Sequence, residues 1–242
     1  MSELAAARWG RWTWRLVAAA VLFGPSAVSA QSVTPGKPGP YVIDLRAAMS
    51  GLPKSSAFHP VIPESTLVPS RGFGLDVGGQ IFVGSIGPAR LGFGANVVRA
   101  RGTATTPAPA SSGATQPPAS GGTLSLLSAS DPIRVAITLT AVTPQISFNF
   151  GTSDGWSYLS GGYGAAWINT TAEGTSAFLP AGPLTLSTKE GASRAANYGG
   201  GARWFIRPHL AVGFDVRFLR VRSSGLRPAT TEVLASAGVS LR

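Results

Sequence analysis

The links between the alternating segments of this chain vary in length in a regular way, and this feature constrains the fold most. Eight segments in which apolar and polar residues alternate are separated by links that are long, short, long, short, long, short and long. The long links are Leu52–Ser70, Arg101–Asp131, Thr171–Ala195 and the middling Ser223–Thr231; the short ones are Gly84–Pro88, Gly151–Gly155 and Arg207–His209. An antiparallel sheet with this pattern has its tight turns at one end and its long loops at the other. We predict a closed sheet whose two ends face different environments.

The eight segments have the length and the period of β-strands. Side chains alternate between the two faces of a strand, so every second residue shares a face. In Leu210–Val221, the clearest segment, Leu, Val and Phe alternate with Ala, Gly, Asp and Arg. The other predicted strands are Tyr41–Met49, Gly72–Val83, Ala89–Arg99, Ile133–Phe150, Trp156–Ile168, Tyr198–Ile206 and Val233–Leu241. The sequence therefore predicts an all-β fold, an eight-stranded antiparallel up-and-down β-barrel.

The segment Ile133–Phe150 changes face along its length. Its apolar residues up to Leu139 share one parity, whereas Phe148 and Phe150 share the other. The change falls beside Pro144, which cannot donate a ladder hydrogen bond and is tolerated at bulges. We predict a β-bulge there, because one extra residue would bring the apolar side chains before and after Pro144 to the same face of the sheet. The alternative is two strands joined by a "TPQ" hairpin, which would give nine strands and break the alternation of link lengths.

Residues 1–30 are typical of a cleaved secretory signal peptide. Three arginines precede the short apolar run Leu16–Gly24, and small residues at Val28–Ala30 precede a cleavage point. The run is shorter than the ~20 residues of a spanning helix, so a membrane anchor is the weaker alternative. No two arginines are adjacent, so we expect export by the general secretory route. A flexible periplasmic lead-in at residues 31–40 and a barrel at residues 41–242 would follow.

Composition excludes several classes of protein. The 242 residues include no cysteine, which excludes a disulfide frame and a thiolate metal site. The net charge of +10 would suit nucleic acid, but export makes anionic lipid the more available partner. The third link contains "TATTPAPASSGATQPPASGG", which cannot bury enough apolar area to offset the entropy lost on ordering. We expect a disordered external loop at about residues 102–128.

The residues on the more polar face of the strands favour a membrane barrel over a soluble export-pathway barrel. The alternation of apolar and polar residues has the same period in both, so it does not distinguish them. The polar residues at mid-strand are Asp44, Arg46, Asp76, Gln80, Arg203, Asp215 and Arg217. Small residues surround them, as the narrow interior of an eight-stranded barrel requires. The other face is apolar without an interrupting charge at mid-strand, as lipid requires. We therefore predict a transmembrane barrel, with girdles of aromatic residues near the strand ends that include Trp156, Tyr158, Trp167, Trp204 and Phe205.

Three segments resemble the small outer-membrane β-barrel proteins of the OmpA/OmpX-like superfamily: Pro144–Gly151, Trp156–Trp167 and Asn197–Phe218. The resemblance covers the mature chain, and its motifs are strand patterns without chemistry. It implies an eight-stranded barrel in the outer membrane of a Gram-negative-type cell, with its short turns in the periplasm. Roles in this superfamily include envelope integrity, adhesion and small-solute passage. The chain departs from the class at its end, where Arg242 replaces the aromatic residue read by the barrel assembly machinery.

Two sets of charged residues are candidate sites. The mid-strand polar residues should form salt bridges within the lumen, because charges removed from water need partners, and such a lumen charge network would plug the barrel. A second set lies at the predicted outer rim: Arg71, Arg99, Arg101, Arg134, Lys189, Arg194, Arg220, Arg222 and Arg227. Arginine and lysine at this height can contact phosphates of lipopolysaccharide.

Catalysis finds little support in the sequence. The two histidines, His59 in the first long link and His209 in a short one, lie at opposite ends of the predicted barrel and cannot act together. We expect no enzyme, metal or cofactor, and a monomer that contacts outer-membrane lipids and, during biogenesis, the assembly machinery. The predicted role is structural or surface interaction with a filled, non-porin interior. The alternatives are a narrow small-solute channel and, less favoured, a lipid-modifying enzyme.

Overall fold

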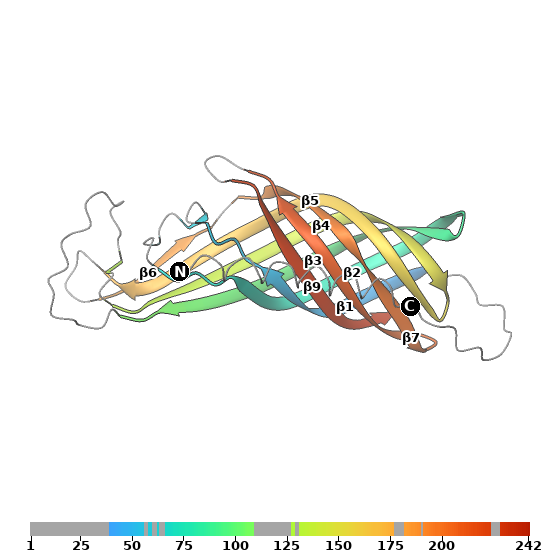
Figure 1. Ribbon diagram of the computed structural model, residues 1–242, viewed down its shortest axis with the longest axis horizontal. Coiled ribbons are helices and arrows are strands. Elements are labelled where there is room, and N and C mark those ends of the chain that lie inside the picture. Colours follow the sequence, from blue (N-terminus) through green and yellow to red (C-terminus); the bar gives the residue numbers. More distant parts are fainter. Residues whose placement is uncertain are drawn as a thin grey trace, which may run out of the picture. The chain divides into compact units, whose positions relative to one another are not determined.

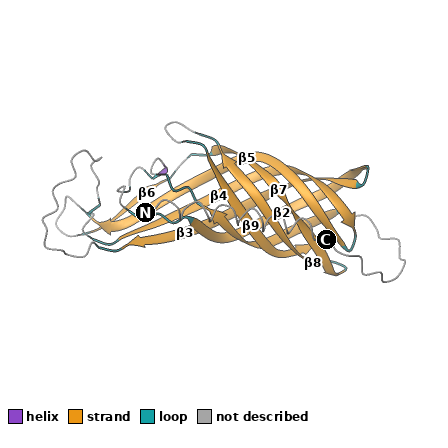
Figure 2. Cartoon of the chain, viewed as in Figure 1, coloured by secondary structure: helices purple, strands orange, loops and turns teal. Residues whose placement is uncertain are grey.

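The computed structural model describes residues 39–55, 58–59, 62, 66–108, 127–128, 131–176, 182–189, 191–223 and 228–242. The predicted signal peptide and most of the lead-in lie outside these residues. Strands make up most of the described chain, as Figure 2 shows. Within the described residues, no helix is long and apolar enough to cross a membrane.

Eight antiparallel strands close into a ring. The strands of the chain are β1 Tyr41–Gly51, β2 Arg71–Ile86, β3 Ala89–Thr106, β4 Ile133–Thr152, β5 Gly155–Thr175, β6 Pro183–Thr188, β7 Ser193–Arg207, β8 Leu210–Val221 and β9 Thr230–Leu241. All except β6 belong to the ring, in which β1 pairs with both β2 and β9 (Figure 1). The predicted eight-stranded antiparallel barrel is confirmed.

The one described strand outside the ring, β6, lies within the link Thr171–Ala195, which is predicted from the sequence to be a loop. It pairs with the end of β5, from Thr170↔Thr188 to Thr175↔Pro183. Leu184 and Leu186 alternate with small polar residues, and their half-buried side chains pack against the interior of the barrel. The alternation of apolar and polar residues that predicts a strand is visible in the sequence here, although it covers only six residues.

The three short links are two-residue turns, and all lie at one end of the barrel. Each separates consecutive strands of the ring: β2 from β3, β4 from β5, and β7 from β8. In the first turn Gly87 has a φ of 56°, a left-handed conformation that glycine adopts without a steric penalty. The chain end also lies here, because the backbone N–H of Arg242 donates to the carbonyl of His209 at 3.3 Å. We call this the turn end, and the opposite one the loop end.

The bulge predicted at Pro144 is wrong, and so is the alternative hairpin. The pairing of β4 with β3 runs without a shift from Ala89↔Phe150 to Thr106↔Ile133, and Pro144 lies opposite Ala95. The odd-numbered residues are buried all the way from Ile133 to Asn149, so the same face of β4 points inward on both sides of Pro144. The interior itself changes instead: it is lined by polar side chains such as Asn149 near the turn end and by apolar ones such as Leu139 near the loop end.

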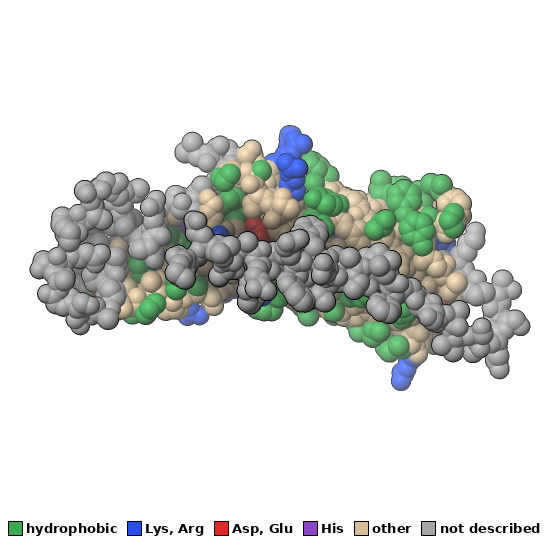
Figure 3. Space-filling model, viewed as in Figure 1, with side chains coloured by type: hydrophobic (Ala, Val, Ile, Leu, Met, Phe, Trp, Pro, Cys, Tyr) green, Lys and Arg blue, Asp and Glu red, His purple; other side chains and the backbone are tan. Residues whose placement is uncertain are grey.

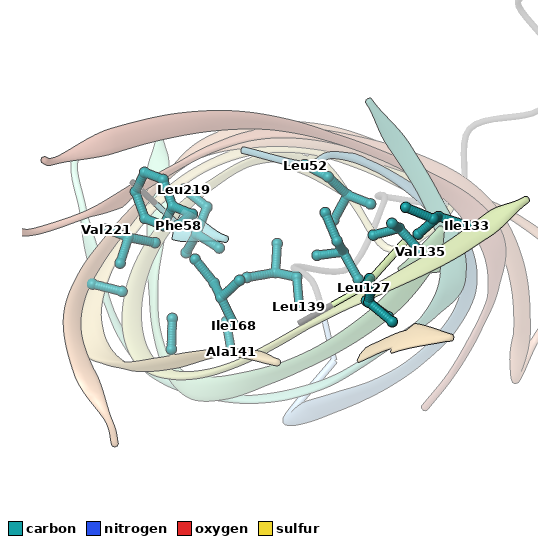
Figure 4. Close-up of a cluster of buried hydrophobic side chains, with 14 residues drawn as sticks. Leu52, Phe58, Leu127, Ile133, Val135, Leu139, Ala141, Ile168, Leu219 and Val221 are labelled. Carbon is teal, nitrogen blue, oxygen red and sulfur yellow. The ribbon is translucent and has the colours of Figure 1, made fainter. Parts of the chain in front are cut away.

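An apolar core fills the loop end of the barrel. Fourteen buried side chains form it: Leu52, Phe58, Leu127, Ile133, Val135, Ile137, Leu139, Ala141, Ala166, Ile168, Ala172, Ala195, Leu219 and Val221. Figure 4 shows this cluster inside the ring, with side chains such as Leu139 and Leu219 labelled. The outward residues at the same height are polar, for example Thr138 and Thr171. At this end the wall therefore has an apolar inside and a polar outside, which is the arrangement of a soluble barrel.

The third link is shorter than predicted. Residues 102–106, expected to be disordered, continue β3 and pair with Ile133–Ile137 of β4. Three of them are threonines, whose branched side chains suit strands. Leu127, also inside the predicted disordered segment, is 2 % exposed because it packs into the loop-end core. Residues 109–126 lie outside the described residues.

Closer to the turn end, large apolar side chains are exposed all around the outer face and form an apolar band, and Figure 3 shows several patches of it on one face. On β2, Phe73 and Val83 are 69 % and 59 % exposed, and the outward residues between them are Leu75, Val77, Gly79 and Ile81. Each of the other seven ring strands also exposes large apolar side chains there. The ten residue steps on β2 span about 33 Å along the strand and about 25 Å along the axis at a tilt of ~40°. That height matches the apolar band of an outer-membrane barrel, roughly 25 Å.

Three of the five aromatic residues predicted to lie in girdles point into the barrel instead. Trp156 and Tyr158 are 3 % and 2 % exposed, and the ring of Phe205 stacks on Trp156 with centroids 5.1 Å apart. They occupy the alternate positions of β5 and β7 whose side chains point into the barrel, the same face as the polar residues nearby. Trp204 does face outward, and Trp167 is half-buried on the outer face.

Replacing Leu139 by Ala should lower the free energy of unfolding by about 2–5 kcal/mol, because it leaves a cavity in the loop-end core. Urea unfolding in detergent micelles, followed by tryptophan fluorescence, measures the loss. The matched control is Leu159→Ala, on the outer face and 63 % exposed, which should change the stability little. Equal losses of stability for the two variants would contradict the placement of the Leu139 side chain inside the barrel.

Candidate functional site: the charged layer in the lumen

The seven mid-strand polar residues predicted for the lumen all point inward and are buried. Their exposed fractions lie between 0 and 3 %. They come from β1 (Asp44, Arg46), β2 (Asp76, Gln80), β7 (Arg203) and β8 (Asp215, Arg217). Each occupies the inward parity of its strand, and ring closure brings these strands face to face across a narrow lumen.

Arg46 contacts all three carboxylates. Its Nη1 lies 3.0 Å from Oδ2 of Asp76 and 3.5 Å from Oδ2 of Asp215, and its Nη2 lies 2.5 Å from Oδ2 of Asp44. Arg46 and Asp76 are directly opposite each other on paired strands, whereas Asp215 reaches Arg46 from β8. One guanidinium thus joins three strands of the ring.

Asp44 forms a two-pronged pair with Arg203 across the lumen. Nε of Arg203 donates to Oδ1 of Asp44 at 2.9 Å, and Nη2 donates to Oδ2 at 2.6 Å. Ser240 Oγ donates to the same carboxylate at 2.6 Å. The guanidinium of Arg203 also lies 4.1 Å from the centroid of the Tyr158 ring. This geometry is the bidentate fork that makes an arginine–carboxylate pair strong, with an added cation–π contact.

The third pair joins Asp215 and Arg217 of β8. Nε and Nη2 of Arg217 donate to the two carboxylate oxygens of Asp215 at 2.7 and 2.9 Å. The hydroxyl of Tyr158 also donates to Asp215. Nη1 of Arg217 donates to Oε1 of Gln145 at 2.5 Å. Three carboxylates and three guanidiniums therefore form one connected network, which we call the charged layer.

Neutral side chains that the sequence analysis did not assign to the lumen complete the charged layer. Asn96 and Ser236 both donate to the carboxylate of Asp76. With Tyr158, Gln145 and Ser240, these partners bring β3, β4, β5 and β9 into the layer, so every strand of the ring contributes to it. Their place at every second position of a strand, on the inward face, is the sequence feature that could have identified these residues.

Gln80 lies apart from the charged layer. Its Oε1 accepts a hydrogen bond from Ser147 Oγ at 3.0 Å, and Ser147 Oγ in turn accepts one from Nδ2 of Asn149 at 2.9 Å. These residues form a neutral polar group on the β2–β4 side of the lumen. Nε2 of Gln80 and Oδ1 of Asn149 are buried without a protein partner.

An aromatic cluster lines the lumen near the turn end. Trp156 packs edge-on against Phe82, with centroids 5.8 Å apart, and stacks on Phe205. The guanidinium of Arg242 lies 4.0 Å from the centroid of the Phe205 ring. From turn end to loop end, the lumen thus holds an aromatic cluster, the charged layer and the loop-end core.

The basic residues predicted for the outer rim lie at or beyond the loop-end edge of the apolar band. Those described are all exposed: Arg71, Arg99, Arg101, Arg134, Lys189, Arg194, Arg220 and Arg222. Arg227 lies outside the described residues. The set divides into a β2–β3 cluster (Arg71, Arg99, Arg101) and a β7–β8 cluster (Arg194, Arg220, Arg222), with Arg134 and Lys189 apart. Within the described part of the chain, none of these side chains forms an ion pair with an acid.

The two histidines have different surroundings. His59 is buried, with Nδ1 2.9 Å from Oγ1 of Thr170 and Nε2 2.9 Å from the carbonyl of Pro53, so it ties the first loop to the inside of β5. His209 is exposed in the third turn, and its Nδ1 lies 3.1 Å from the carbonyl of Arg242. The structure places the two rings at opposite ends of the barrel. No group of three or more metal-ligating side chains occurs among the described residues.

No protein-family model matches the chain, and no curated protein matches it. Similar solved structures include the attachment invasion locus protein Ail of Yersinia pestis, with 14 % identity over 84 % of this chain and 98 % of that one, and a TM-score of 0.46. Neisserial surface protein A is 13 % identical over 84 % of this chain and 97 % of that one, with a TM-score of 0.45. Outer membrane protein AlkL is 13 % identical over 90 % and 96 %, with a TM-score of 0.33. The identities are too low to transfer a function from any of them.

Replacing Arg217 by Ala should lower the stability by about 3–5 kcal/mol, because Asp215 loses its forked partner while it stays buried. The shift of the thermal unfolding midpoint in detergent measures this loss. Arg220→Ala, three residues along β8 and exposed, is the control and should leave the midpoint nearly unchanged. The double variant D215N/R217M should recover part of the loss, because it removes both charges. A wild-type midpoint for Arg217→Ala would refute the importance of the pair.

Proposed function

We propose that this chain is an outer-membrane β-barrel protein with a structural or surface-interaction role and a filled, non-porin interior. The observation that carries the proposal is the pairing of an apolar outer band with a charged interior in one closed ring. Large apolar side chains such as Phe73 and Ile81 are more than half exposed, while Arg46 and Asp76 are buried. Lipid hydrocarbon outside and a narrow polar lumen inside account for both faces at once.

The contacts of the charged layer support a plug rather than a pore. Every ring strand contributes at least one side chain, and the three positive charges balance the three negative ones. Opening a path through this level would separate pairs such as Asp44–Arg203, which costs several kcal/mol for each buried ion left without a partner. The loop-end core and the aromatic cluster lie on either side of the layer.

A narrow small-solute channel is the second candidate, and one observation favours it. Nε2 of Gln80, Oδ1 of Asn149 and Oγ of Ser160 are buried in the lumen without protein partners. Buried polar atoms of this kind are commonly satisfied by internal water. A path of single water molecules beside the charged layer would fit these atoms.

Export by the general secretory route, with residues 1–30 as a cleaved signal peptide, is part of the proposal. Its support is the sequence of those residues. The barrel would then be inserted by the assembly machinery with the turn end in the periplasm and the loop end outside. A lipid-modifying activity has no support in the arrangement of the histidines, since His59 is held by Thr170 and Pro53 within the barrel wall and the first loop.

The purified protein in planar lipid bilayers should give no large ohmic conductance steps, because the charged layer blocks the lumen. Single-channel recording at neutral pH measures this directly. The variant D44N/R203M, which removes one forked pair, should conduct more than the wild type. Steady steps of porin size from the wild type would overturn the filled interior and favour a channel.

The outer rim should bind phosphates of lipopolysaccharide, because its arginines are exposed without acidic partners at the edge of the apolar band. Replacing Arg220 and Arg222 by Ala should lower the total lipopolysaccharide that co-purifies in mild detergent by about two-fold. Quantification of phosphate and lipid A in the purified sample provides the readout. Lipid content equal to that of the wild type would count against the rim contact.

A further inference from the structure

We propose that the outer face of β1–β3 holds one specifically bound phosphorylated lipid, with its head group on Arg99 and Arg101 and one acyl chain in an apolar groove below them. The inference rests on the membrane location proposed above and names a site within the outer rim. Two independent features carry it, a pair of unpaired arginines and a groove, and they lie on the same strands.

The head-group part of the site follows from the strand register. On the outer face, Arg99 lies opposite Leu75 on one side and Thr140 on the other, and Arg101 lies opposite Phe73 and Thr138. Directly opposite residues on the same face have Cβ atoms about 4.5–5.5 Å apart. Each arginine therefore stands between an apolar residue and a threonine hydroxyl, with no carboxylate opposite it.

The two arginines are spaced to share one phosphorylated head group. They are two residues apart on one strand, so their Cα atoms are separated by about 6.6 Å on the same face. Two guanidiniums at this spacing can both donate forked hydrogen bonds to phosphate oxygens. Trp167, opposite Thr140 in the next strand pair, adds an aromatic ring at the same height.

The acyl part of the site is an open groove of about 560 Å³ on the same outer wall. Its lining includes Tyr41 and Ile43 of β1, Gly79 and Ile81 of β2, and Phe93 of β3. The missing side chain of Gly79, beside the small Ala95, leaves space between the larger side chains of Ile43 and Ile81. A Cβ built on Gly79 would meet only the carbonyl of Val42, at 3.7 Å, so the space above it is open.

The arginines and the groove align along β3. Ala95, which pairs with Gly79, lies four residues below Arg99, a distance of about 13 Å along the strand. The residue between them on the outer face is Val97, which lies opposite Val77, so the path is apolar. An acyl chain whose head group sits at Arg99 thus reaches the groove without crossing a polar side chain.

A lipid fits this site better than a soluble polyanion. A soluble anion would use the arginines and leave the groove empty, whereas an amphiphile uses both. The arginines stand at the edge of the apolar band, at the height where lipid head groups meet water. The β7–β8 cluster is the natural comparison, since Arg220 and Arg222 show the same spacing on another wall of the barrel.

The test measures binding of bisphosphorylated lipid A to the full-length mature protein by native mass spectrometry after stringent detergent exchange. The wild type should retain one lipid A per barrel. Retention should fall at least ten-fold in R99A/R101A and at least five-fold in G79L, because the added side chain enters the groove and its Cβ would meet no atom closer than 3.7 Å. The matched control R220A/R222A should keep the single lipid, even if the total lipid bound in mild detergent falls. Heat-modifiable gel migration checks that each variant is folded.

Several outcomes would overturn the site. Unchanged lipid A retention in R99A/R101A would show that these arginines do not bind the head group. Unchanged retention in G79L would show that the groove does not hold the acyl chain. Equal loss in R220A/R222A would mean that rim charge binds lipid without a defined site. Equal competition by lipid A and soluble inositol hexaphosphate would mean a polyanion site. A folded, membrane-inserted wild type that retains no lipid A would reject this inference alone, whereas a barrel that does not enter membranes would reject the proposed function as well.

Discussion

Closure of the sheet into a ring is the constraint on which the rest of the structure depends. Pairing of β1 with β9 leaves no open edge between the ring strands, so their backbone groups find partners within the barrel wall. Closure also separates two faces, and the strict alternation of each strand assigns its mid-strand charged residues to the inner one. Asp44, Arg46 and Asp76 are buried for this reason, although isolated buried charges would be strongly unfavourable. The ring supplies their partners from strands that are distant in sequence.

The barrel consists of two zones with opposite polarity. Near the turn end the outside is apolar and the inside is polar, as a lipid environment requires. Towards the loop end the outside becomes polar and the inside becomes the apolar core around Leu139, as water outside requires. The inversion takes place within β4 without any change of register. The height at which it occurs marks the boundary between the proposed membrane zone and the external part, and the exposed arginines stand at that height.

Much of the fold could be predicted from the sequence, because a period of two and the lengths of the links are local properties. The strands around Tyr41–Met49 and Leu210–Val221 were placed with the right faces. The apparent change of face in β4 predicts a bulge, but the register is regular and the environment inside the barrel changes instead. The inward aromatic residues Trp156 and Tyr158 were misplaced because composition near a strand end does not specify a face, whereas parity does. The charges of the lumen could be named, but their partners could not, since pairs such as Asp44–Arg203 depend on ring closure over 159 residues of sequence.

The most direct test of a lipid-facing outer band is where the processed protein resides in the cell and whether it needs detergent to dissolve. Cell fractionation, followed by gel electrophoresis of heated and unheated samples, measures both. A barrel with a lipid-facing outer band should be found in the outer-membrane fraction, should be released only by detergent, and should migrate faster when unheated because the closed barrel stays folded. A monomer that is freely dissolved in detergent-free buffer would contradict the placement of the apolar band in lipid, because the band that includes Phe73 and Ile81 would then have to face water.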